Sequence, residues 1–163
     1  MRLLLSGLIA SMVLSAVPTQ AQQVTNTQVK ALVEALRLAA PKTGKQNDRL
    51  YSEWQVTPGI IPNWSKKCIG RELTPTQFEA NAVAARNVVT CTTRRELQKQ
   101  YPVSGNKESV AVRYFTCWWM TGNYTGCSSG PTAAYVQRVI RFYRQVGSKR
   151  PVAVKPGQTS PQN

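Results

Sequence analysis

The chain has 163 residues, with 21 Lys and Arg against seven Asp and Glu, a formal net charge of +14 at pH 7 and no histidine. Because it lacks an imidazole, it has no Ser-His-Asp triad, Cys-His dyad, histidine-ligated zinc ion or histidine pH switch. Acid–base chemistry is then left to a Tyr, a Lys or one of the seven carboxylates, which are Glu34, Asp48, Glu53, Glu72, Glu79, Glu96 and Glu108.

Residues 1–21 have the pattern of a secretory signal peptide. Arg2 precedes an apolar run from Leu3 to Val17, and small residues around Ala21 follow as a cleavage pattern. A membrane span needs about 20 apolar residues, so we expect cleavage after Ala21, with an uncleaved anchor as the alternative. Removing 21 of the 163 residues leaves 142 with a net charge of +13, a size that suits one domain. We expect this domain to be exported, periplasmic or extracellular, with no transmembrane segment.

Residues 22–147 are expected to form a single compact domain that is mainly α-helical. The first helix begins near Thr27, groups its apolar side chains on one side and is stopped by Pro41. Between Tyr51 and Trp64, aromatic and aliphatic residues are interrupted by prolines, which predicts a short strand or hairpin rather than a long helix.

Further helices are predicted after a strong start signal at Thr74. Thr74 suits the N-cap, Pro75 the first turn and Gln77 the capping-box position. The next helix is expected over residues 81–98. Dense apolar content then predicts a helix over residues 110–120 that is buried nearly all round.

The last helix is predicted to begin at Gly130-Pro131. It carries three arginines at helical spacing, here called the basic ridge: Arg138, Arg141 and Arg144. Residues 148–163 are rich in Pro, Gly and Lys without a periodic apolar face, so we expect a disordered tail. The predicted fold is five or six helices around one core, with a short β-like insertion after the first helix.

Four cysteines indicate disulfides, because the chain is expected to reach an oxidising compartment. Cys68, Cys91, Cys117 and Cys127 are separated by 23, 26 and 10 positions, without the CxxC spacing of metal or redox sites. Three pairings are open to four cysteines. We predict the two local ones, Cys68–Cys91 and Cys117–Cys127, with free buried thiols as the alternative.

Six short motifs occur in order within the domain. They are Tyr51–Gln55, Ile61–Trp64, Leu73–Phe78, Gly105–Asn106, Trp119–Gly122 and Tyr135–Val139. In this order they resemble motifs of the lysozyme-like superfamily, in particular the phage-associated branch of the lytic transglycosylases. The resemblance implies a lysozyme-like helical fold and cleavage of the β-1,4 glycosidic bonds of peptidoglycan by a single glutamate, with no cofactor and no metal ion.

The resemblance implies a catalytic glutamate at the end of the first helix, in a Glu-Ser-Gly type of motif that is missing from this chain. Glu34, 21 positions before Gln55, is the nearest equivalent, although Ala-Leu-Arg follows it in a continuing helix. Glu53 is the second candidate, because Tyr51 and nearby tryptophans offer an apolar setting that raises a carboxyl pKa. The alternative for Glu34 is a solvated acid on an amphipathic helix, and the alternative for Glu53 is a partner-facing or solvated role. Ser52 replaces the glycine of the family motif.

A sugar-binding groove is also implied by the resemblance, because aromatic rings stack on the faces of sugars. The candidate substrate-binding residues are Tyr51, Gln55, Trp119 and Tyr135, with core packing as the alternative for the aromatic ones. Of the neighbours Trp118 and Trp119, we expect one to point inward and the other to lie nearer the groove.

The net charge predicts an anionic partner. Export favours peptidoglycan or another anionic envelope polymer over nucleic acid, for which the chain has no recognised motif. We expect a monomer. Three functions remain open: an enzyme that cleaves glycan strands, a catalytically inactive relative that binds the cell wall, and a disulfide-stabilised envelope protein of unrelated function.

Overall fold

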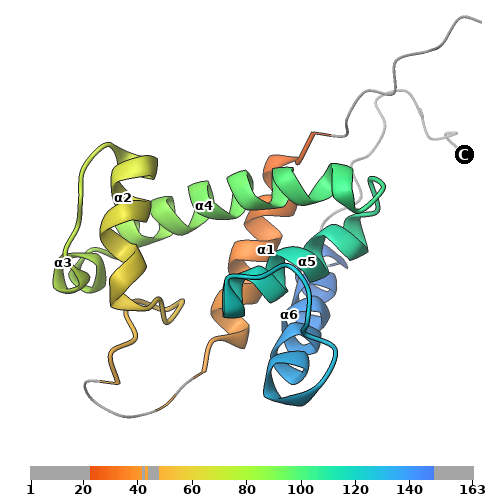
Figure 1. Cartoon of the computed structure of the whole chain (residues 1–163). Coiled ribbons are helices and arrows are strands. Elements are labelled where there is room, and N and C mark those ends of the chain that lie inside the picture. The colour runs from red at the N-terminus through yellow and green to blue at the C-terminus, as the bar shows by residue number, and fades with distance from the viewer. Residues whose placement is uncertain (1–22, 42, 44–47, 149–163) are drawn as a thin grey trace, which may run out of the picture.

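The computed structural model describes residues 23–41, 43 and 48–148, and most of these residues are helical (Figure 1). The helices are α1 (Asn26–Ala39), the 3-10 helix η1 (Pro58–Ile60), α2 (Ile61–Ile69), α3 (Pro75–Ala80), α4 (Ala82–Val103), α5 (Glu108–Thr121) and α6 (Gly130–Ser148). The prediction of a mainly α-helical domain is confirmed. The predicted signal peptide and all of the predicted tail after Ser148 lie outside the described residues.

The long helix α4 runs across the molecule and connects its two ends (Figure 1). Helices α2 and α3 pack beside its first turns, whereas α1 and α5 pack against it further along, and α6 covers α1 and α5. The core between these helices is built from fully buried side chains, among them Leu32, Leu36, Val88, Leu97 and Phe115. No helix in the described part of the chain is long and apolar enough to cross a membrane.

Helix α1 begins earlier than predicted, because Thr25 and not Thr27 is its N-cap. The Thr25 hydroxyl accepts a hydrogen bond from the Gln28 backbone N–H at 3.1 Å, and the Gln28 side chain accepts one from the Thr25 N–H at 2.8 Å. This reciprocal capping box satisfies two backbone donors at the helix start. Thr27 lacks a Gln or Glu three residues later, so it cannot form the same box.

The segment from Tyr51 to Trp64 is only partly as predicted. Tyr51 and Val56 form an isolated antiparallel bridge, with N···O distances of 2.9 and 2.8 Å, which is the expected β-like insertion. After it the chain turns helical, and Pro62 lies in the first turn of α2. Proline is tolerated there because the first helical N–H groups have no intrahelical acceptor. The prediction of a strand or hairpin up to Trp64 was therefore wrong.

Two predicted helix starts are confirmed, at Thr74 and at Gly130. The Thr74 hydroxyl accepts from the Gln77 N–H at 3.2 Å, and the Gln77 side chain accepts from the Thr74 N–H at 2.9 Å, so the capping box is complete. Helix α5 differs from its prediction because it is buried on one side only: Ala111 and Phe115 are buried, whereas Met120 is 44% exposed. Ser148, predicted to open the tail, is the last residue of α6.

Both predicted disulfides are present. Cys68–Cys91 links α2 to α4, and Cys117–Cys127 links the end of α5 to the loop before α6. The two bonds close stretches of chain with sequence separations of 23 and 10 and attach α2 and the loop before α6 to their neighbouring helices. The alternative of free buried thiols is excluded.

Candidate functional site

The two glutamates nominated from the sequence meet at one arginine. Arg37, one turn after Glu34 on α1, donates from Nε to Glu34 Oε2 at 2.9 Å and from Nη2 to Glu34 Oε1 at 2.6 Å. Its third nitrogen, Nη1, lies 3.4 Å from Glu53 Oε1. Arg86 of α4 approaches the other oxygen of Glu53 at 3.9 Å. The structure thus gathers two carboxylates and two guanidinium groups from three parts of the chain.

This arrangement holds Glu34 in its charged form. The hydrogen bonds from Arg37 lower the pKa of Glu34 below its ordinary value, and the charges of Arg37 and Arg86 add to this against the opposing effect of partial burial. The Glu34 side chain is 30% exposed and the Glu53 side chain 52% exposed. A general acid that works near neutral pH needs a raised pKa in an apolar setting. The surroundings of Glu34 have the opposite effect.

A tight turn presents Glu53 to the arginines. Ser52 and Gln55 flank it with φ values of 65° and 54°, in the left-handed region that glycine adopts most readily. The Gln55 backbone N–H and side-chain Nε2 both donate to the Ser52 carbonyl, at 3.0 and 3.1 Å. The Ser52 N–H in turn donates to the carboxylate of Glu79. Gln55, predicted to bind substrate, therefore uses part of its hydrogen-bonding capacity within its own turn.

Trp54 anchors this turn to α1. Its ring is 2% exposed, and its Nε1–H donates to the Val33 carbonyl at 2.9 Å. The Arg86 guanidinium lies over the ring, 5.2 Å from its centroid. From the sequence we expected the aromatic residues here to give Glu53 an apolar setting, but a cation covers the nearest ring and pairs with Glu53 itself.

The other predicted aromatic residues lie in two different surroundings. An aromatic cluster joins α2 to the end of α5 and consists of Trp64, Trp118, Trp119 and Tyr124. Trp64 lies 5.9 Å from Trp118 and 5.4 Å from Trp119 between ring centroids, and Trp118 stacks on Tyr124 at 6.3 Å. All four are half-buried. Burial is therefore similar for Trp118 and Trp119, and it does not distinguish a ring that points inward from one that lies nearer a groove.

Tyr51 and Tyr135 complete the set of predicted substrate-binding residues. Tyr51 is half-buried and forms the bridge with Val56. Tyr135 lies in the core with 4% of its surface exposed, and this burial raises its pKa. So little exposed surface leaves its ring almost no room to contact a sugar.

Glu96 is a carboxylate that the sequence analysis did not single out. Its side chain is 11% exposed, accepts from the Tyr124 hydroxyl at 3.0 Å and pairs with Lys99 at 2.7 Å. It therefore ties the aromatic cluster to α4. The available signal was the Glu96–Lys99 spacing of three positions, which is equally typical of a pair on a solvated helix face.

Comparison of the chain with known protein families, with curated proteins and with solved structures finds no match. In the described part of the chain, no group of three Cys, Asp or Glu is placed to hold a metal ion. The features of the chain that bear on its function are the ion-pair network around Arg37, the aromatic cluster and the net charge.

Proposed function

We propose that this is an exported, cationic, lysozyme-like protein that binds the glycan strands of peptidoglycan, or another anionic polymer of the cell envelope, without cutting them. The observation that carries the proposal is the ion pair between Arg37 and both oxygens of Glu34. The motif resemblance alone is compatible with both binding and cleavage, whereas this ion pair argues against cleavage.

Cleavage of a glycosidic bond requires an acid that still holds a proton near neutral pH and gives it to the leaving oxygen. Glu34 is ionised under these conditions and has both oxygens engaged by Arg37. Glu53 is more exposed and is shared between Arg37 and Arg86. Glu34 is therefore not suited to donate a proton to a sugar oxygen, and each oxygen of Glu53 faces a guanidinium group.

Binding needs only affinity for the polymer. The half-buried rings of the aromatic cluster offer apolar faces of the kind that sugars stack on, and the excess of 21 basic over seven acidic residues attracts an anionic wall polymer. Such electrostatic attraction weakens as salt screens it. Binding to the wall is therefore expected to decrease with ionic strength without disappearing, because the stacking contacts are apolar.

Co-sedimentation with purified peptidoglycan tests the proposal. Three variants are compared with the natural protein: Glu34→Gln, Glu53→Gln and, as the matched control, Glu72→Gln, which removes the charge of an exposed partner of Lys66. We expect all four proteins to sediment with the polymer. A protein that stays in the supernatant at low salt would refute wall binding and leave an envelope protein of unrelated function.

A further inference from the structure

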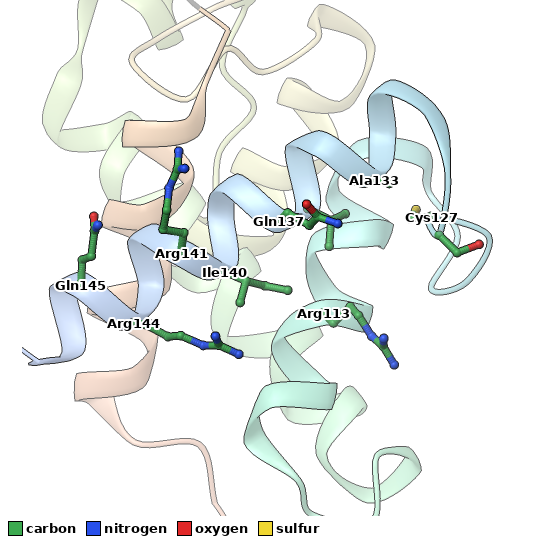
Figure 2. A pocket seen from close by; sticks show the side chains of 10 residues that line it. Arg113, Cys127, Ala133, Gln137, Ile140, Arg141, Arg144 and Gln145 are labelled. Carbon is green, nitrogen blue, oxygen red and sulfur yellow. The ribbon is translucent and has the colours of Figure 1, made fainter.

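A hollow of about 630 Å³ lies between α5 and α6, and none of the residues in the ion-pair network around Arg37 lines it (Figure 2). Its ten lining residues combine cations, amides and apolar groups: Arg113, Cys127, Ser128, Ala133, Val136, Gln137, Ile140, Arg141, Arg144 and Gln145. The volume falls in the range of about 300–1,000 Å³ that is usual for small-ligand sites. We refer to it as the basic hollow.

Two arginines from different helices flank the basic hollow. Figure 2 shows Arg113 of α5 and Arg144 of α6 on either side of Ile140, with Arg141 pointing away from both. Neither Arg113 nor Arg144 forms an ion pair with any described residue. Glu108, a carboxylate near Arg144, already binds Gln28 at 2.6 Å and Tyr143 at 2.5 Å. The two guanidinium groups are thus available to an external anion.

The rest of the lining indicates what kind of anion fits. The floor is apolar, with Val136 3% exposed and with Ala133 and Ile140 half-buried. Gln137 and Gln145 are exposed, so their side-chain amides can pair with the backbone amides of a peptide. Guanidinium groups bind carboxylates through two parallel hydrogen bonds. A short acidic peptide carries all three kinds of matching group: carboxylates, backbone amides and small apolar side chains. An acyl chain has no amide groups that could form hydrogen bonds with the two glutamines.

The wall formed by Cys127 and Ser128 is held in place before any ligand arrives. The Cys117–Cys127 disulfide fixes this loop to the end of α5, and Arg113 lies one helical turn before Cys117. The loop wall and the α5 side of the basic hollow are therefore connected by one covalent bond. A site preorganised in this way loses less conformational freedom on binding.

We propose that the basic hollow binds the acidic peptide stem that branches from a peptidoglycan strand, with Arg113 and Arg144 on its carboxylates. This inference rests on the proposed function, since it names the part of the same polymer that the hollow recognises. It differs from that function in one respect: the hollow recognises the peptide, and the aromatic cluster contacts the sugar.

Calorimetric titration with two separate probes distinguishes the two proposals. The first probe is the free stem peptide, and the second is glycan strand from which the peptides have been removed. The variants are Arg113→Ala and Arg144→Ala, and the matched control is Arg95→Ala, an exposed arginine on α4 outside the hollow. Because the three arginines are exposed, circular dichroism is expected to show unchanged helix content in all variants.

We expect the natural protein to bind both probes. Each hollow variant should bind the free peptide about tenfold more weakly and the peptide-free glycan with unchanged affinity, while Arg95→Ala leaves both affinities within about twofold. Peptide that fails to bind while glycan binds would overturn the basic hollow alone. The basic hollow would also be overturned if Arg95→Ala weakened peptide binding as much as Arg144→Ala. The net positive charge of the surface would then explain peptide binding without a specific site. If neither probe binds, the proposed function fails as well.

Discussion

Arg37 binds both carboxylate oxygens of Glu34, at 2.9 and 2.6 Å, from one turn further along α1. The same guanidinium reaches Glu53 at 3.4 Å, so a single side chain compensates the charge of both candidate acids. The hydrogen bonds from Arg37 hold the pKa of Glu34 below its ordinary value, so this carboxylate is stabilised in its ionised form. This relationship is the basis for proposing a protein that binds the wall without cutting it.

The Glu34–Arg37 pair is expected to make the free energy of unfolding depend on pH in the acidic range. Because the folded-state pKa of Glu34 lies below its ordinary value of 4.5, the pair stabilises the fold above that pH. The contribution is lost as the pH falls from about 4.5 through the folded-state pKa. Glu34→Gln is expected to lower the free energy of unfolding by about 0.5–1 kcal/mol at pH 7, and to lose less stability than the natural protein between pH 5 and 3.

Urea unfolding at pH 7, 5 and 3 measures this effect. Glu72→Gln is the control, because its pair with Lys66 is about 60% exposed and the stability should change little. Identical losses between pH 5 and 3 in Glu34→Gln and the natural protein would contradict the assigned role of the pair.

Trp54→Phe is expected to loosen the turn that carries Glu53. The substitution removes the hydrogen bond from the indole to the Val33 carbonyl and leaves a gap in a site that is 2% exposed. We expect a loss of about 2 kcal/mol in the free energy of unfolding, measured by urea unfolding at pH 7. A loss below about 0.5 kcal/mol would show that the turn does not depend on this anchor.

Tyr101 is expected to make the free energy of unfolding depend on pH in the alkaline range. Burial, together with the nearby charge of Glu108, raises the pKa of Tyr101 to about 12, against a partly opposing hydrogen bond from Gln28. Since the ordinary value is 10.0, the stabilising contribution is complete below pH 10 and is lost as the pH rises toward 12. Tyr101→Phe is expected to flatten the decline in unfolding free energy between pH 9 and 11.5. Part of the decline remains, because burial also raises the pKa of Tyr135. An unchanged slope would contradict the prediction.

The two disulfides are expected to contribute similarly to the stability of the fold but differently to peptide binding. They close loops with sequence separations of 23 and 10, and removing either pair by double substitution to Ala should cost about 3 kcal/mol in chain entropy. Only the loss of Cys117–Cys127 should also weaken binding of the free stem peptide, since that bond fixes one wall of the basic hollow. Equal peptide affinity in the two double variants would count against a preorganised wall.

Features set by neighbouring residues were predictable from the sequence. The Thr74–Gln77 capping box needs only a spacing of three positions, and the two disulfides were predicted by pairing each cysteine with a near neighbour in the chain. Pro62 was misleading, because the same residue that breaks a helix interior also suits a first helical turn. Which of these applies depends on the residues that follow it.

The site was less predictable, because its contacts connect distant parts of the chain. The spacing of three positions indicated a Glu34–Arg37 pair, but the sequence gave no indication that Glu53 joins this pair or that Arg86 covers Trp54. Arg144 was included in a basic ridge on one helix, whereas its function is proposed with Arg113 of another helix, 31 positions away. Such pairings depend on how helices pack, and the helical period does not encode that.

Release of soluble fragments from purified peptidoglycan is the most direct test of the central claim. The natural protein is incubated with the polymer at pH 5 and pH 7, and the supernatant is analysed for glycan fragments by mass spectrometry, while the pellet is analysed for bound protein. We predict bound protein in the pellet and no fragments above the protein-free control at either pH. Fragments that appear with the natural protein and vanish with Glu34→Gln or Glu53→Gln would contradict the account and identify the catalytic acid.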